Sequence, residues 1–396
     1  MALKNNTWTL NNWYDQDVAG NVSYNGAKEL WGWGDNEYGE MAQNSTTVGY
    51  YSSPIQVSNN TTWNFYPVGH SHVAGENLLT KTDGTLWVWG NNNAGQLGMN
   101  DIVKRSSPTQ VGSDTDWSTA IASRSVSFAL KTNGTLYAMG GRNSDGTSGI
   151  PSLSNNQNFS SPVQVPGTWG DKIYSNNEWS AAIKDDGTLW AWGYNNHGQL
   201  GQNNQTKYSS PVQIPGTNWN RMACGAQESA LATKTDGTLW FWGYNGYGGA
   251  GKNQTSIYGY SSPVQIGTGT DWSLDDRKIA CGQYGGCNAI KTDGTLWSWG
   301  YARYGICGDN KDHSSPVQTP GTNWNTVSNS YSRYIMATKT DSTLWNWGAD
   351  GPWMGGALFG SDSGPGNIRR SSPVQVPGTW GNVIATRRNV FVQNVL

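Results

Sequence analysis

One phrase recurs along the whole chain and constrains its fold more than any other feature. The phrase D-G-T-L-W-x-W-G, or a close variant, occurs seven times and ends at glycines that lie 48 to 57 residues apart. These glycines are Gly34, Gly90, Gly140, Gly193, Gly243, Gly300 and Gly348. A period of this size predicts an array of repeated structural units instead of unrelated domains.

A second phrase, S-S-P-V-Q or a variant, keeps the same period. Its copies begin at Ser52, Ser106, Ser160, Ser209, Ser261, Ser314 and Ser371. A lone tryptophan follows each copy, at Trp63, Trp117, Trp169, Trp219, Trp272, Trp324 and Trp380. The first phrase and the lone tryptophans together account for 19 of the 23 tryptophans, so burying tryptophan between successive repeats is the expected basis of the fold.

The residues of each repeat predict antiparallel strands. D-G between two apolar runs favours a tight hairpin in which both turn residues have positive φ, and Asp341-Ser342 should therefore be strained. Because side chains alternate along a strand, Leu86 and Val88 face one side while Trp87 and Trp89 face the other, so both faces should be buried. The proline of S-S-P-V-Q-V suits an outer edge strand.

About four strands in roughly 50 residues is the size of a propeller blade. We therefore expect an all-β fold: a single domain over residues 27–396, forming a seven-bladed β-propeller of four-stranded antiparallel blades. The first L-W-G-W-G lacks a preceding half and the last repeat stops before its own, so the two chain ends should complete one blade. Residues 1–26 are an N-terminal extension that either adds a strand there or packs outside. A linear solenoid is the alternative, but it needs polar capping repeats that the sequence does not show.

The words A-C-G-x-x-x-S-A-L-x-T-K-T-D-G-T-L-W-x-W-G-x-N-x-x-G-Q-L-G and S-S-P-V-Q-V resemble the repeats of the regulator of chromosome condensation family over residues 27–396. The resemblance implies a seven-bladed β-propeller. The founding member of that family is a nucleotide exchange factor with a wedge in one blade and a basic tail, and neither is evident in this sequence. No functional residue is therefore carried over from it, because one fold serves unrelated functions.

Composition limits the partners. Only 13% of residues are charged and the net charge is −2, so neither nucleic acid nor membrane insertion is expected. The N-terminus has no apolar stretch of the kind a secretory signal needs, which favours a cytoplasmic origin. The basic doublets are expected to be solvated surface; they are Lys104-Arg105, Arg369-Arg370 and Arg387-Arg388.

The sequence contains few groups of the kind that enzymes use, so no catalytic, cofactor or metal site is expected. His197 occupies a loop position that holds Tyr247 and Tyr304 in later repeats, which indicates a surface variant and not a catalytic base. Asp309 and Asp312 could hold calcium only weakly, because no glutamate follows at the spacing of a known calcium loop. The four cysteines, Cys224, Cys281, Cys287 and Cys307, are too few and too unevenly placed for a disulfide framework or a zinc site. Cys224 and Cys281 stand in matching A-C-G words and are expected to be small buried side chains.

Binding is expected in the loops that run from W-G to S-S-P, which vary while the strands do not. Their mixture of Tyr, Asn, Gly and Ser is typical of protein-binding loops. The tyrosine candidates are Tyr194, Tyr244, Tyr247, Tyr301 and Tyr304, although the first tyrosine of each loop has an alternative role in packing against the next blade. The longest loop adds Trp353, Met354, Phe359, Arg369 and Arg370, and it either folds back as a plug or docks on a partner.

These features predict a non-enzymatic binding propeller with protein partners in an assembly. A surface of low charge that is rich in Asn, Gly, Ser and Thr favours a virion-associated component, such as a capsid decoration, tail or fibre accessory. The alternative is an intracellular regulator or inhibitor that binds one protein partner, and a glycan-binding adhesin is a further one.

Overall fold

The computed structural model describes residues 29–394 apart from a set of short segments. The segments outside the description are 48, 65–74, 124–125, 142–145, 153–157, 177, 226–227, 256–257, 276, 283–284, 303, 310, 331–333, 350–368 and 386–388. The expected N-terminal extension, residues 1–26, and both histidines His70 and His72 lie outside the described residues.

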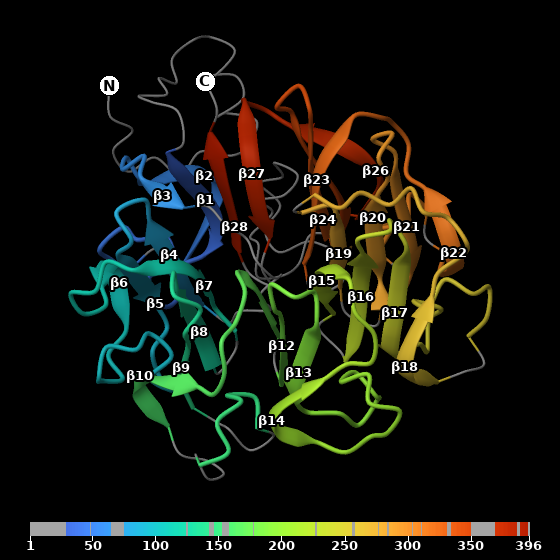
Figure 1. Ribbon diagram of the computed structural model, residues 1–396. Coiled ribbons are helices and arrows are strands. Elements are labelled where there is room, and N and C mark those ends of the chain that lie inside the picture. Colours follow the sequence, from blue (N-terminus) through green and yellow to red (C-terminus); the bar gives the residue numbers. More distant parts are fainter. Residues whose placement is uncertain are drawn as a thin grey trace.

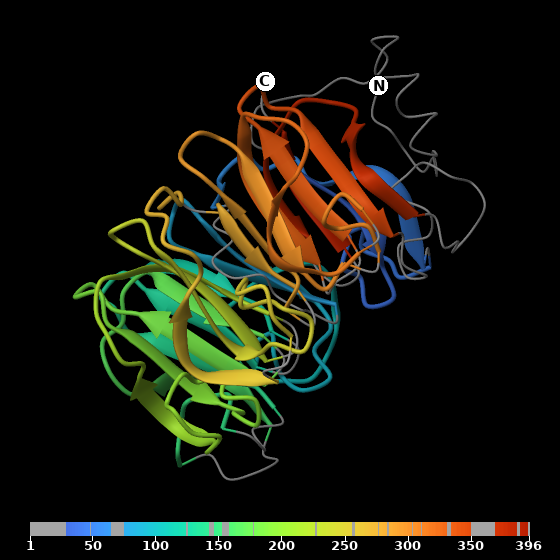
Figure 2. The same ribbon diagram turned by 90° about the vertical axis from the view of Figure 1, so that its right-hand side faces the viewer.

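The described residues form seven four-stranded sheets arranged around a central axis. Figure 1 shows the sheets as successive blades, with β10, β14, β18 and β22 at the rim, and Figure 2 shows the same blades from the side. Every strand pair is antiparallel, and the described part of the chain contains no α-helix. The predicted seven-bladed propeller is therefore confirmed.

Six blades follow one another along the chain. Blade 1 contains β3 (Trp63–Asn64), β4 (Glu76–Lys81), β5 (Leu86–Gly90) and β6 (Arg105–Gln110). Blade 2 contains β7 (Trp117–Ile121), β8 (Val126–Lys131), β9 (Leu136–Gly140) and β10 (Phe159–Val165). Blade 3 contains β11 (Lys172–Ser175), β12 (Trp179–Ile183), β13 (Leu189–Gly193) and β14 (Tyr208–Gln213).

The other three of the six have the same order. Blade 4 contains β15 (Trp219–Cys224), β16 (Ser229–Lys234), β17 (Leu239–Tyr244) and β18 (Gly259–Gln265). Blade 5 contains β19 (Ile279–Cys281), β20 (Cys287–Ile290), β21 (Leu296–Gly300) and β22 (His313–Gln318). Blade 6 contains β23 (Trp324–Ser330), β24 (Tyr334–Lys339), β25 (Leu344–Ala349) and β26 (Arg369–Val376).

The seventh blade joins the two ends of the chain. It contains β1 (Leu30–Asp35), β2 (Tyr50–Ser58), β27 (Trp380–Ala385) and β28 (Asn389–Asn394) in the order β2-β1-β28-β27. Strands β1 and β28 pair directly, with Trp33 opposite Val390, and Figure 1 shows the blue and red strands side by side. This pairing closes the ring, as predicted, and excludes the linear solenoid.

The third strand of each blade contributes to two cores, as its two apolar faces predict. In blade 1, Leu86 and Val88 pack in the cluster that holds Trp117 of blade 2, whereas Trp89 packs with Trp63 and residues of the closing blade. The indole Nε1 of Trp89 donates to the Glu40 carbonyl, 2.7 Å away. A blade therefore buries its tryptophans only with a neighbour on each side.

The first tryptophan of each W-x-W pair is an exception to the predicted burial on both faces. Trp87 and its equivalents in blades 3 to 6 are half-buried, although Trp31 in the closing blade is buried. Trp87 Nε1 donates to Thr85 Oγ1 at 2.8 Å, and Lys81 Nζ lies 3.7 Å from its ring centroid. The side chain lies at the end of the blade beside the turn, where a lysine covers it in place of another blade.

The D-G turns also differ from the prediction in one respect. Of the D-G pair only the glycine has positive φ, 79° at Gly84. The loop between the strands has three residues and not two, because Lys81 N donates to the Thr85 carbonyl. Asp83 Oδ1 accepts from both the Thr85 N–H and its hydroxyl. Ser342 takes the glycine position with φ 64°, so the strain predicted there falls on the left-handed residue alone.

Candidate functional site

Each third strand starts after a D-G turn and ends in W-G, so the two connections leave opposite ends of the blade. We call the end with the D-G turns the turn face and the end with the W-G to S-S-P loops the loop face. The predicted binding loops therefore share one face of the ring, together with the turns that join the first and second strands.

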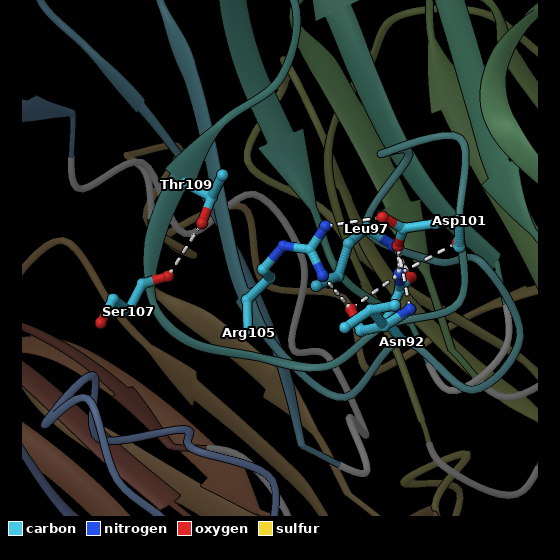
Figure 3. Close-up of polar contacts among 7 residues, drawn as sticks. Asn92, Leu97, Asp101, Arg105, Ser107 and Thr109 are labelled. Atoms are coloured by element: carbon cyan, nitrogen blue, oxygen red, sulfur yellow. Dashed lines mark hydrogen bonds and ion pairs between the residues drawn. The ribbon is translucent and has the colours of Figure 1, made fainter.

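In four of the loops one asparagine organises the base: Asn36, Asn92, Asn195 or Asn245. In blade 1, Asn92 Oδ1 accepts from the Leu97 N–H at 2.9 Å and Nδ2 donates to the carbonyls of Asp101 and Val103 (Figure 3). Asn195 and Asn245 bond their loops in the same way. The loops are thus fixed by their own hydrogen bonds, which provides a rigid base for variable side chains.

The basic doublet at Arg105 is used within its own loop. Arg105 Nη2 lies 2.7 Å from Asp101 Oδ2, and Nη1 donates to the Val103 carbonyl (Figure 3). Hydrogen bonds from the Val103 N–H and from Arg105 hold the pKa of Asp101 below its ordinary value. This arginine is therefore a structural part of the loop.

In four of the loops a second asparagine fastens the loop to the next blade. Asn100 N donates to the Ser160 carbonyl at 2.6 Å, and Ser161 Oγ donates to Asn100 Oδ1 at 3.0 Å. A Cβ on Gly95 would lie 2.7 Å from Ser160 Cα, so the loop and the S-S-P strand are in close contact. The same backbone hydrogen bond joins Asn44 to Ser106, Asn203 to Ser261 and Asn253 to Ser314. S-S-P, which we expected to be an edge strand alone, thus also joins adjacent blades.

On this scaffold six aromatic rings form a continuous series across the loops of blades 3, 4 and 5. We call it the aromatic ladder: His197, Tyr258, Tyr244, Tyr247, Tyr301 and Tyr304. Successive ring centroids lie 4.7 to 6.2 Å apart, and most of the contacts are edge-to-face. Such pairs are favourable beyond the area they bury and keep the rings in fixed orientations.

One end of the ladder is polar. His197 Nδ1 contacts the Glu228 carboxylate, and Nε2 lies 3.1 Å from the Tyr258 hydroxyl. Burial lowers the pKa of His197, which favours the neutral ring at neutral pH. A neutral imidazole with its proton on Nδ1 donates to Glu228 and accepts the hydroxyl proton of Tyr258 at Nε2.

Glu228 also has an unusual backbone conformation. Its φ is 69°, a left-handed value, and the equivalent position before the second strand holds Gly75 in blade 1 and Gly285 in blade 5. A residue with a Cβ costs about 1 to 2 kcal/mol in this conformation. Strain of this kind concentrates at functional sites, and here it places a carboxylate against His197.

The structure brings together four of the ten predicted site residues. Tyr244, Tyr247, Tyr301 and Tyr304 belong to the ladder, but Tyr301 is buried at 7% exposure and supports Tyr247 from below. The fifth predicted tyrosine, Tyr194, has Lys207 Nζ 4.7 Å from its ring centroid.

The other five predicted residues come from the longest loop. Trp353, Met354 and Phe359 lie outside the described residues, so the choice between plug and interface stays open. Arg369 and Arg370 belong to β26, opposite Ala349 and Gly348.

Sequence reasoning missed Tyr258 and Glu228. Tyr258 is 64% exposed and lies just before the S-S-P strand, where loops of different length cannot be aligned by spacing. Glu228 was detectable in principle, since a glutamate stands there where Gly75 and Gly285 stand in other repeats.

The described residues offer little other chemistry. Among them, no group of three or more His, Cys, Asp or Glu side chains could hold a metal ion. Asp309 accepts from His313 Nε2 at 2.9 Å and Asp312 accepts from the Ala302 N–H at 2.7 Å, so both carboxylates have partners within their loop. The four cysteines are free and buried, as predicted for Cys224 and Cys281. No helix in the described residues is long and apolar enough to cross a membrane.

Comparisons with known proteins identify the repeat. The model of the regulator of chromosome condensation (RCC1) repeat matches residues 83–130 and 186–232, and a second model of that repeat matches residues 172–199. A Protein RCC2 homolog from Xenopus laevis is 30% identical over 138 residues, 34% of this chain and 27% of its own length. The ultraviolet-B receptor UVR8 from Arabidopsis thaliana is 27% identical over 307 residues, 73% of this chain and 52% of its own.

The chain thus spans about a quarter to a half of the length of these curated relatives. Among solved structures, human WBSCR16 superimposes with a TM-score of 0.76 at 19% identity, covering 93% of this chain and 99% of that one. Yeast RCC1 (Prp20), solved bound to Kap60, superimposes with a TM-score of 0.73 at 17% identity, covering 93% and 89%. The chain therefore contains RCC1 repeats at the matched residues, and its seven-bladed fold is similar to that of these solved propellers.

Proposed function

We propose that the chain is a non-catalytic regulator or inhibitor propeller that binds one protein partner through the loop face of blades 3 to 5. The aromatic ladder carries this proposal. It offers rings in fixed orientations from three neighbouring loops, with the 64% exposed Tyr258 beside His197 at its polar end.

The physical properties of the ladder suit a protein surface. Tyrosine supplies a large contact area and one hydrogen-bonding group while losing few rotamers on binding. The loops beneath are already fixed by Asn195 and Asn245, so little further ordering opposes association. Low overall charge makes contact area, and not long-range attraction, the main source of affinity.

Relatives are consistent with a partner that is a protein. Prp20 has been solved bound to Kap60, and a second structure of it concerns its binding to Gsp1p and histones. The names of these relatives give no support to the virion role and the virion location expected from composition. Both remain predictions that sedimentation of source material with intact particles would favour.

Site-specific photo-crosslinking tests the proposal. A photoreactive phenylalanine analogue at position 258 is expected to capture one protein, whereas the same group at position 50 is the control. Tyr50 is 49% exposed but lies on β2 of the closing blade, away from the ladder blades.

Binding of the captured protein is then measured with purified components. Tyr258→Ala is expected to weaken binding by tenfold or more, on the order of 2 kcal/mol, while Tyr50→Ala leaves it unchanged. Equal capture at positions 50 and 258, or unchanged binding of Tyr258→Ala, would reject the ladder as the interface.

A further inference from the structure

Two cysteines of blade 5 form a pair that the proposed function does not use. Cys281 ends β19, Cys287 begins β20, and the two are direct cross-strand partners. Their Sγ atoms lie 3.5 Å apart, and the side chains are 0% and 1% exposed. Two thiols that face each other in this way are a candidate for covalent chemistry.

The position of the pair in the hairpin suits a disulfide. Gly282 N donates to the Gly286 carbonyl at 2.7 Å, so Gly282 and Gly286 form a hydrogen-bonded pair and the two cysteines form the adjacent non-hydrogen-bonded pair. Cα atoms in such a pair are about 4.5 Å apart. Disulfides span Cα distances of about 4.4 to 6.8 Å, so the backbone needs little rearrangement.

Equivalent positions in the neighbouring blades show that this site turns two side chains toward each other. In blade 3, Ser175 and Ser180 are the cross-strand partners, and their Oγ atoms lie 2.9 Å apart. In blade 4 the partners are Cys224 and Ala230, which cannot form a bond. Of these three blades, only blade 5 has a thiol on both strands.

We propose that Cys281 and Cys287 form a reversible intrachain disulfide, which makes the inner hairpin of blade 5 an oxidation site for a peroxide. One thiolate attacks hydrogen peroxide, giving a sulfenic acid and, after protonation, one water. The second thiol displaces the sulfenic oxygen as another water. In total, two S–H bonds and the O–O bond break, one S–S bond forms, and peroxide gains two electrons and two protons. A dithiol reverses the reaction by exchange.

The surroundings of the pair set its rate. Burial raises the pKa of the Cys287 thiol well above its ordinary value, so little thiolate exists at neutral pH. Oxidation therefore requires local opening of the hairpin, whose turn contains Gly282, Gly285 and Gly286. We expect slow oxidation that accelerates as the pH rises.

Peptide mass spectrometry of the full chain gives a direct test. After incubation with hydrogen peroxide at about pH 8, the chain is denatured, alkylated and cut with trypsin. Cys281 and Cys287 fall in one peptide, between Lys278 and Lys291. This peptide is expected to be lighter by two hydrogen atoms and to take up no alkylating agent, while Cys224 and Cys307 are alkylated. Treatment with dithiothreitol restores alkylation.

The serine pair of blade 3 supplies the matched control. The double variant C281S/C287S reproduces the pair Ser175 and Ser180, so it is expected to fold and to melt close to the reduced wild type. Peroxide should raise the melting temperature of the wild type and leave that of the double variant unchanged. Full alkylation of both cysteines after peroxide, irreversible sulfinic acid, or a bond to Cys224 or Cys307 would overturn the proposal. None of these results depends on the identity of the protein partner.

Discussion

The turn face and the loop face are built from the same repeats but differ in what they repeat. On the turn face, five aspartates make the same two bonds to a threonine: Asp83, Asp186, Asp236, Asp293 and Asp341. That threonine accepts from the half-buried tryptophan, and a lysine covers the ring. On the loop face the backbone contacts repeat, but the residue types vary: in blade 4 Tyr247 stands at the position of His197, and in blade 3 Glu178 stands at the position of Glu228.

This difference distinguishes the residues that hold the ring together from those whose type can vary and serve binding. A contact repeated in most blades must serve closure, because each blade needs the same neighbours. Side chains that depart from the repeat on a rigid loop base are available for binding. The following substitutions test the separation, each against a matched position.

The largest expected effect is loss of a buried tryptophan. Trp242 is fully buried and its Nε1 donates to the Gln199 carbonyl of blade 3 at 2.7 Å, whereas Trp240 is half-buried beside its turn. Trp242→Ala is expected to lower the free energy of unfolding by about 3 to 5 kcal/mol, and Trp240→Ala by clearly less. Urea denaturation measures both. Equal losses of unfolding free energy would show that the buried and the half-buried tryptophan contribute equally to the stability of the ring.

Next is the contact between a turn and the following blade. A Cβ on Gly237 would lie 2.1 Å from the Thr270 carbonyl oxygen, whereas one on Gly267 would meet nothing within 4 Å, and both glycines have positive φ. Left-handed strain of about 1 kcal/mol is common to both alanine variants. Gly237→Ala should therefore lose more stability than Gly267→Ala in thermal unfolding. If the two variants lose similar amounts of stability, the close contact between Gly237 and Thr270 does not contribute to the stability of the ring.

Acid should weaken the turn face through its aspartates. Hydrogen bonds from Thr238 lower the pKa of Asp236 in the folded chain. A lowered folded pKa gives stability that is present above the unfolded pKa of about 3.9 and is lost as the pH falls through the folded pKa. Asp236→Asn should thus show a smaller loss of melting temperature between neutral and acidic pH than the wild type.

Blade 2 contains the natural control for that experiment. Asn133 makes the same two bonds to Thr135 without a titratable group. Asn133→Asp is accordingly expected to add acid sensitivity. If neither variant changes the acid response, the turn aspartates do not determine it.

The sequence predicted the ring because its information is local and repeated. Spacing alone revealed seven blades, and the incomplete repeats at the two ends predicted the pairing of β1 with β28. It did not reveal that His197 meets Tyr258, because the two are 61 residues apart, His197 replaces a tyrosine of other repeats, and Tyr258 stands in a loop of variable length. Nor could residue type show that the turn has three residues, since that depends on the bond from Lys81 to Thr85. Contacts between blades that occur once require the structure.

The smallest expected effect lies at the one turn among these where the repeat departs from glycine. Ser342 holds φ 64° and its carbonyl accepts from the Trp380 N–H at 2.8 Å, the same contact that Gly294 makes with Trp324. Ser342→Gly keeps that hydrogen bond and removes the left-handed strain, at the expense of a more flexible unfolded chain, so a gain of about 0.5 to 1 kcal/mol is expected. The reverse change, Gly294→Ser, should lose at least as much, since its Cβ would lie 3.3 Å from Asn323 Cα. Urea unfolding of both variants decides the point: a loss of stability in Ser342→Gly would show that the serine hydroxyl contributes more than its backbone costs, and the turn face would then be less uniform than its hydrogen bonds suggest.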